Sequence, residues 1–429
     1  MDLTNEQGRV SAYKIAWGAA LVFYFLEYLV RAAPAVMMPE LSRALNLDMV
    51  GVSGVVGSYY YTYALASLAA GISLDRFGAK APVAIGCGLL AIGCLLFVVP
   101  VPAVAEVGRL MQGFGSAFAF TGAVYLAAHG FSGGVLATAI GVTQCLGMLG
   151  GSAGQLAVGP LMREGIGLSG FWIAVAIACL ATATWLGFAA PREGRPANAG
   201  KGFADMVAPF KTVFANPQSY LCGLTAGLLF VPTTVGGMIW GVAFYQQDRG
   251  FDRQQAVTAA AMVPLGWAIG CPLFGALADK LGRRKLALVI GQALMLVAIV
   301  LAAVMAAPVP VYGLMLILGI GSGAAMIPYT IIKEVNPDRV KGSATGVMNF
   351  LTFSVTAIVS PIFSRLLGGS LAANPDHAEH FRDAVWFWAV IVAVSMGISL
   401  LLRETGRAGG VHAGSKGTPS FPGGHVSNK

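Results

Sequence analysis

The chain has 429 residues, of which 56% are hydrophobic and 11% are charged, and its mean hydropathy is +0.73. These values exclude an ordinary water-soluble globular protein and indicate an integral membrane protein. The net charge of +8 has a topological explanation, namely basic loops beside anionic lipid headgroups, and no nucleic-acid-binding motif accompanies it.

Long apolar runs follow one another along the chain, and a bilayer core takes about 20 residues of helix. The first run is too long for a signal peptide and no small-residue cleavage site follows it, so we expect an uncleaved first span. By length the sequence predicts twelve spans, at residues 13–38, 49–72, 80–100, 104–128, 136–160, 168–190, 218–244, 256–276, 284–306, 309–333, 341–367 and 383–403.

Polar segments rich in glycine and proline divide this series into two halves. Every lysine falls on the side that holds both termini, which the positive-inside rule makes cytoplasmic. We expect a cytoplasmic N-terminus at 1–12, an N-terminal six-helix bundle at 13–190, a cytoplasmic linker at 191–217, a C-terminal six-helix bundle at 218–403 and a disordered cytoplasmic tail at 404–429.

Charged side chains occur inside two of the predicted spans, where a lone charge costs roughly 2.5 to 3.5 kcal/mol. Glu27 and Arg31 are four residues apart, so they lie on one helix face and can form an ion pair. Arg109 lies in the fourth span, with Glu106 one turn away as its expected partner. Two interpretations stay open for these charges: helix packing, or binding of an anionic solute with transfer of a proton.

Uncharged polar residues of the first half are further candidates for solute contact. Tyr59, Tyr60 and Tyr63 cluster in "GSYYYTYALAS", and Gln112 follows Arg109 by three residues. The second half has no acid or base within 220–246, 256–278 or 286–332, so we expect the first half to supply any charged chemistry of the cavity.

Two turns repeat one pattern at equivalent places: "GISLDRFGAK" and "GALADKLGRR". We expect the first glycine to let helices approach closely, the second to permit a tight turn, and the acid to bond a base or a backbone N–H. The predicted conformational latches are Gly71, Asp75, Arg76, Gly78 and Lys80, and Gly275, Asp279, Lys280, Gly282 and Arg284. Each half is therefore a copy of one unit, related by pseudo-symmetry.

This repeat resembles the signature of the major facilitator superfamily, in the order Gly, acid, base, Gly, bases. A second family motif, Arg-x-x-Gln-Gly-x-Gly in the fourth span, is matched by "RLMQGFG" at 109–115. The fifth-span pattern of drug antiporters is not reproduced, because Gln155 follows Gly154 where they have proline. The first two spans are also similar to the major facilitators of magnetotactic bacteria, which reside in the magnetosome membrane and are associated with iron.

The resemblance implies a secondary transporter of a bacterial inner membrane, or of the magnetosome membrane, that works by alternating access as a monomer. It also implies proton coupling through Arg109 and a nearby acid. The arginines favour an anionic solute, with an iron complex and an organic carboxylate as the two open substrate classes. Partners are then the solute or ion and the lipid bilayer.

Other functional classes find little support in the sequence. No P-loop and no catalytic constellation is recognisable, so we expect neither an enzyme nor a cofactor. His377 and His380 in "NPDHAEH" are weak candidates for a metal site. A transporter-like sensor or scaffold without flux stays open as an alternative, with the tail as the place where a protein partner could bind.

Overall fold

The computed structural model describes residues 3–131, 133–192, 203–247, 249–305, 308–337, 340–373 and 380–406, and every regular element in them is helical. Elements of the first half are α1 (Leu3–Ala32), η1 (Ala33–Ala35), α2 (Met38–Leu45), α3 (Met49–Gly57), α4 (Tyr59–Phe77), α5 (Lys80–Phe97), α6 (Pro102–Gly130), α7 (Gly133–Leu156), α8 (Val158–Arg163) and α9 (Gly167–Ala189). Elements of the second half are α10 (Phe203–Phe214), α11 (Pro217–Val231), the π-helical η2 (Pro232–Gly237), α12 (Gly241–Gln247), α13 (Arg253–Leu281), α14 (Arg284–Val304), α15 (Pro308–Ser322), η3 (Gly323–Ala325), α16 (Met326–Glu334), α17 (Lys341–Ala373) and α18 (His380–Ser399).

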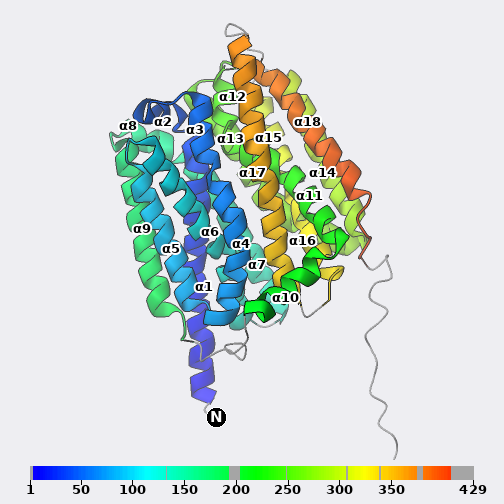
Figure 1. Cartoon of the computed structure of the whole chain (residues 1–429). Coiled ribbons are helices and arrows are strands. Elements are labelled where there is room, and N and C mark those ends of the chain that lie inside the picture. The colour runs from blue at the N-terminus through cyan, green and yellow to red at the C-terminus, as the bar shows by residue number, and fades with distance from the viewer. Residues whose placement is uncertain are drawn as a thin grey trace, which may run out of the picture.

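Nine helical segments among the described residues are long and apolar enough to cross a membrane. The other three predicted spans, 49–72, 136–160 and 383–403, fall on α3 with α4, on α7 and on α18. The protein is an all-α membrane protein. In Figure 1 the N-terminal end of α1 and the linker helix α10 lie at one end of the bundle, while α2, α8 and α12 lie at the other.

The helices pack first within their own half. In the first half α6 contacts α1, α4 and α5, and in the second α15 contacts α13 and α14, while α11 contacts α17 and α18. Two helix pairs, α4 with α17 and α7 with α13, form most of the contact between the halves, and α3 adds to it by packing against α17. The central interface is therefore built mainly from α4, α7, α13 and α17, and α1 and α6 pack against its first-half helices.

The structure adds detail to three of the predicted segments. Helix α1 begins at Leu3, so the polar N-terminal segment continues the first span as a helix. Helix α10 forms within the predicted linker and packs against α17. The tail does not begin as a disordered segment, because residues 404–406 are packed against the second half; residues 407–429 lie outside the described part.

Glycines of the fourth-span motif set how closely α6 approaches its neighbours. A Cβ on Gly113 would overlap the backbone carbonyl of Tyr59 on α4, and a Cβ on Gly115 would overlap that of Gly86 on α5. Side-chain-free surfaces of this kind replace hydrophobic driving force as the means of helix association in lipid. The motif therefore holds α4 and α5 against the helix that carries Arg109.

We expect Gly113→Ala to lower the free energy of unfolding by about 1 to 3 kcal/mol, because the backbone of α4 must move away. The measurement is the apparent melting temperature of the purified protein in detergent. Gly88→Ala on α5 is the matched control, since a Cβ there meets nothing within 4 Å. An equal melting temperature for both variants would contradict this account of the motif.

Candidate functional site

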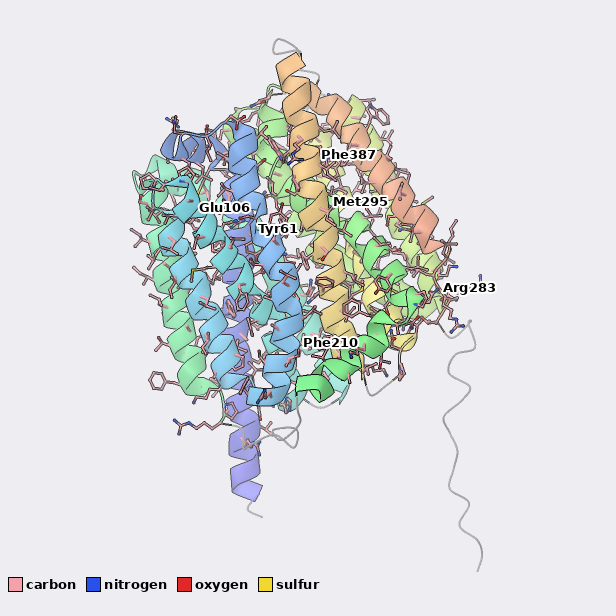
Figure 2. The ribbon with its side chains drawn as sticks, viewed as in Figure 1. Tyr61, Glu106, Phe210, Arg283, Met295 and Phe387 are labelled. Carbon is pink, nitrogen blue, oxygen red and sulfur yellow. The ribbon has the colours of Figure 1, made fainter. Side chains whose placement is uncertain are left out.

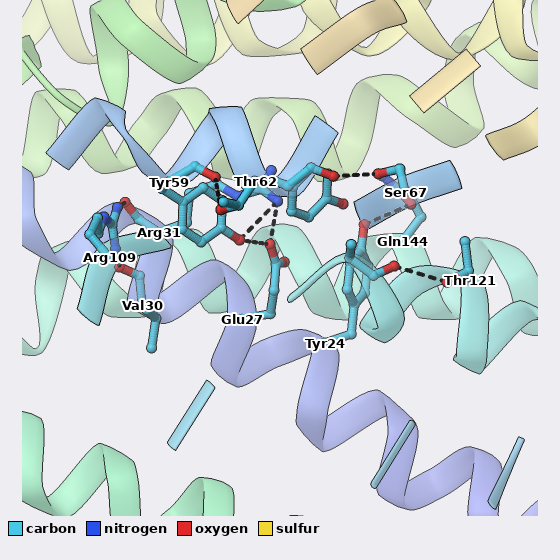
Figure 3. A network of polar contacts seen from close by, with 12 residues as sticks. Tyr24, Glu27, Val30, Arg31, Tyr59, Thr62, Ser67, Arg109, Thr121 and Gln144 are labelled. Carbon is cyan, nitrogen blue, oxygen red and sulfur yellow. Dashed lines mark hydrogen bonds and ion pairs between the residues drawn. The ribbon is translucent and has the colours of Figure 1, made fainter. Parts of the chain in front are cut away.

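A buried charged centre lies where α1 meets α4, as predicted from the four-residue spacing (Figure 3). Arg31 Nη2 donates to Glu27 Oε1, and both side chains are inaccessible to solvent. The Tyr59 hydroxyl donates to the same carboxylate oxygen at 2.5 Å and accepts from Arg31 Nη2 at 3.3 Å. The three side chains thus form one closed hydrogen-bonded group inside the protein.

Aromatic rings surround the Arg31 guanidinium. Its Cζ lies 4.3 Å from the ring centroid of Tyr28 and 4.7 Å from that of Tyr63, with Tyr59, Tyr60 and Phe353 at 5.3, 5.8 and 5.1 Å. Cation–π attraction at such distances stabilises a cation most where water is excluded. Phe353 comes from α17 in the second half, so the surroundings of Arg31 join the two halves.

The charged centre keeps unused hydrogen-bonding capacity. Within the described residues Glu27 Oε2 and Arg31 Nε and Nη1 have no hydrogen-bond partner. Leaving buried charged atoms unpaired costs free energy, because a low-dielectric interior replaces water poorly. The pair is therefore suited to exchange partners, with a proton at the carboxylate or an anion at the guanidinium.

Arg109 is buried, and no acid among the described residues forms an ion pair with it. Its Nε donates to the Val56 carbonyl at 3.0 Å, and Nη1 donates to the Val30 carbonyl at 3.0 Å and to Gln112 Oε1 at 2.7 Å. The Val30 carbonyl needs such a donor because the residue four positions later, Pro34, has no N–H. Val30 and Val56 lie in the last turns of α1 and α3, where helix dipoles favour a cation.

The predicted pairing of Glu106 with Arg109 is wrong. Glu106 is exposed near the start of α6, at the end of the bundle away from the N-terminus (Figure 2). Carbonyl groups of α1 and α3 accept hydrogen bonds from the guanidinium of Arg109. This side chain therefore holds α6 against those two helices. Gln112 supports this role, because it accepts from Arg109 and lies 3.7 Å from Cys94 Sγ.

A narrow cavity lies between the halves beside the charged centre, with a volume of about 30 Å³, enough for one or two water molecules. Of the three predicted tyrosines only Tyr63 lines it, while Tyr59 bonds Glu27 and Tyr60 stacks on Phe353. The lining residues are Tyr24, Tyr28, Tyr63, Phe120, Gln144, Phe230, Trp267, Ala325, Met326, Tyr329, Asn349, Thr352 and Phe353. Glu27 and Arg31 stand behind the rings of Tyr28, Tyr63 and Phe353.

The second half supplies polar groups that the sequence analysis missed. The Tyr329 hydroxyl donates to Asn349 Oδ1 at 2.7 Å, and both residues line the cavity. An amide in the middle of the apolar run 341–367 was a usable signal for Asn349. No sequence signal marked Phe353, because an aromatic residue in a membrane helix is ordinary.

The turn at 275–284 is fastened within the second half. Arg284 forms ion pairs with Asp279 at 2.6 Å and with Glu334 at 3.2 Å. The Glu404 carboxylate accepts from the backbone N–H of Arg284 at 2.7 Å, and the Thr405 hydroxyl donates to Glu334 at 2.5 Å. Sequence reasoning missed Glu404, which caps α14 from the start of the tail.

Other predicted latch residues fit less uniformly. Gly78 and Gly282 have φ of 68° and 62°, the left-handed region that favours glycine. Close helix approach at Gly71 and Gly275 is not seen, because a Cβ on either would meet nothing within 4 Å. Lys80 begins α5, while Arg76 and Lys280 are exposed; the side chain of Asp75 lies outside the described part.

The metal candidates cannot be placed. His377 and the side chain of His380 lie outside the described residues. Within those residues no group of three or more His, Cys, Asp or Glu side chains could hold a metal ion.

Comparison with solved structures supports the fold. A bacterial homologue of the human lysosomal transporter Spinster, in an inward-facing and unoccupied conformation, is 16% identical with a TM-score of 0.73, over 91% of this chain and 97% of that one. A variant of the nucleoside transporter NupG is 14% identical with a TM-score of 0.69, over 90% of this chain and 99% of that one.

Comparison of sequences finds a short match to a drug efflux pump and a longer match to a family model. The drug efflux pump JefA of Mycobacterium tuberculosis is 29% identical over 134 residues, which is 31% of this chain and about a quarter (26%) of the pump's length. The family model described as Major Facilitator Superfamily matches residues 20–361. The chain is therefore a member of the major facilitator superfamily, a multi-pass membrane transporter and not an enzyme.

Proposed function

We propose that this protein is a proton-coupled secondary transporter of a small anionic solute, with twelve spans in two six-helix bundles and both termini on the cytoplasmic side of a bacterial inner membrane. The observation that carries the proposal is the buried Glu27–Arg31–Tyr59 group beside the cavity between the halves. Arg109 positions this group by holding the carbonyls of Val30 and Arg31, at 3.0 and 3.3 Å.

The way the halves meet supports the twelve-span arrangement. The repeated turn follows α4 in the first half and α13 in the second, so these helices are equivalent, and α7 and α17 are equivalent by order. When each helix is replaced by its equivalent, the interface pair of α4 with α17 becomes the pair of α13 with α7, so the equivalence exchanges the two pairs. A pseudo-two-fold axis between the bundles has this effect, and it is the symmetry that alternating access uses.

Contacts across the halves favour a conformation closed at the end away from the termini. Arg253 at the start of α13 forms an ion pair with Glu40 of α2 at 2.8 Å and donates to the Val36 carbonyl at 2.8 Å. Ser53 of α3 donates to Ser364 of α17 at 2.9 Å. A cavity of about 350 Å³ remains between α2 and α12 beside these contacts, and a cavity of about 240 Å³ lies between the halves at the opposite end, so the cross-half contacts carry this assignment. The solute route then starts on the cytoplasmic side.

Electrostatics gives a coupling step at the charged centre. Removing one partner from a buried ion pair costs about 3 to 5 kcal/mol unless another charge replaces it. When Glu27 takes up a proton, Arg31 loses its counter-ion and an anionic solute can take that place. Proton and anion then bind together, and an empty carrier returns with the Glu27–Arg31 pair restored.

A second candidate is export of an aromatic drug-like compound. The similarity to the drug efflux pump JefA favours it, and the ring-rich lining of the central cavity suits such a solute. The iron and magnetosome interpretation stays a prediction from the first two spans. The assay panel should therefore contain simple carboxylates, ferric citrate and ethidium.

We expect Glu27→Gln to abolish the response of uptake to a pH gradient while solute exchange without a gradient persists, because the variant mimics the protonated carboxyl. The measurement is uptake of the labelled panel into proteoliposomes, with and without an imposed pH gradient. Glu106→Gln is the matched control, since that acid is exposed. A Glu27→Gln protein that keeps the full gradient response would refute coupling through this acid.

We expect loss of the Arg253–Glu40 ion pair to favour the state open at the end away from the termini. The pair is partly exposed, so the population should shift roughly twofold to fivefold in Arg253→Gln. The measurement is the distance distribution between spin labels on exposed positions 43 and 247, which lie in the first and second half. The charge swap Glu40→Arg with Arg253→Glu should restore the original distribution; failure to do so would mean that the pair holds α2 locally and does not hold the halves together.

A further inference from the structure

A cavity at the end of the bundle that holds the termini is lined by a lysine, Lys333, that forms no ion pair with the described residues. Helices of both halves line this cavity, with Val124 of α6 and Ile140 of α7 facing Ala278 of α13, Thr330 and Lys333 of α16. Lys333 is partly buried, and no hydrogen bond or ion pair joins its side chain to the described residues, since the nearby acids pair with Arg284. The charge therefore acts on whatever enters the cavity.

The neighbouring carboxylates are bonded to groups other than Lys333. Arg284 also lines the cavity, but Asp279 and Glu334 hold it in ion pairs. Glu334 is next to Lys333 in sequence, yet its two carboxylate oxygens bond Arg284 and Thr405. These two cations and two carboxylates sum to zero, but both carboxylates are bonded to Arg284 and neither forms an ion pair with Lys333, which lies in the last turn of α16, where the helix dipole favours a cation.

This cavity borders the central one. Both are lined by Phe120, Met326 and Tyr329, and the hydrogen bond from Tyr329 to Asn349 stands at the boundary. A solute that passes Tyr329 therefore moves from the surroundings of Lys333 to the rings that cover Arg31. The cavity beside Lys333, at about 240 Å³, has room for a small organic anion, whereas the central cavity, at about 30 Å³, does not.

We propose that Lys333, with the hydroxyl of Thr330, forms an anion-binding site at this mouth of the transport route, separate from Arg31, and that its ligand is a small carboxylate. The lysine supplies three donors and a full charge, and the hydroxyl supplies a fourth donor. The proposal that the Lys333 site selects anions for the central site rests on the function proposed above. Binding of a carboxylate at Lys333 does not itself depend on transport.

The test measures the charge that a reagent meets inside the cavity. Thr345 lines the same space on α17, so Thr345→Cys provides a reporter thiol in the full-length protein. Two methanethiosulfonates of similar size are compared, one anionic with a sulfonate group and one cationic with a trimethylammonium group. Modification at residue 345 is followed by mass spectrometry in lipid nanodiscs, which requires no transported solute.

We expect Lys333→Gln to lower the ratio of anionic to cationic modification rates about fivefold, because one unit charge is removed at short range. Lys333→Arg should keep the ratio. Lys211→Gln is the matched control, since it removes an exposed lysine of α10 from the same end of the bundle. An unchanged ratio in Lys333→Gln, or an equal fall in Lys211→Gln, overturns the proposal.

A second measurement separates this site from the proposed function. Unlabelled benzoate or citrate, at increasing concentration, should slow modification of residue 345 when Lys333 is present and have no effect in Lys333→Gln. Protection by a carboxylate without uptake of any panel member would keep the Lys333 site and reject anion transport. Equal protection in both proteins would reject the site, whatever the uptake result.

Discussion

The low dielectric of a membrane interior is the constraint on which the rest of this structure depends, because every buried charge must find its partner inside the protein. Two arginines meet that requirement in different ways. Arg31 has a carboxylate, a phenol and a cage of rings, whereas Arg109 has backbone carbonyls of α1 and α3. Carbonyls cannot be protonated or carried away, so the bonds of Arg109 are permanent. A carboxylate can be neutralised, so the bond of Arg31 is conditional. Arg109 thereby positions helix α1, which carries Arg31. The proposed exchange of partners takes place at Arg31.

Helix breaks make this arrangement possible. Pro34 ends α1 just beyond Arg31 and leaves the Val30 carbonyl without an amide donor, and the chain breaks again between α3 and α4 near Val56. Arg109 reaches both free carbonyls because Gly113 and Gly115 bring α6 against α4 and α5. Motif residues that are far apart in sequence thus serve one purpose, which is to hold irregular backbone at membrane depth without unpaired groups.

Much of this could be predicted from sequence, where the physics is local. The separation of four residues on one helix was sufficient to predict the Glu27–Arg31 ion pair. The apolar runs and the repeated turn were sufficient to predict the family and a division of the chain into two halves. Prediction failed where the partner comes from elsewhere in the chain. Glu106 was the nearest acid to Arg109 along its helix, but carbonyls of two other helices lie closer in space. Glu404 looked like the start of a disordered tail, and only the fold brings it to the first turn of α14. The drug-antiporter pattern was absent at Gln155, and the structure gives that residue a different use, since it donates to the Gly237 carbonyl across the interface at 3.1 Å.

The unequal halves follow from the same constraint. The first half carries the charges of the centre, and the second half contributes Phe353, which lies against Arg31 and is attached to α17. Any rocking that separates α17 from α4 removes that ring and lets water approach the ion pair. Coulomb attraction falls in proportion to the effective dielectric, so the Glu27–Arg31 bond is strongest when the halves are closed around it and weakest when they part. Under the proposed mechanism, proton and solute exchange at the pair is easiest in an open state and hardest in a closed one. In that mechanism the uncharged ring of Phe353 links conformation to charge state, so the proposed acid–base chemistry uses one half of the protein and its control uses both.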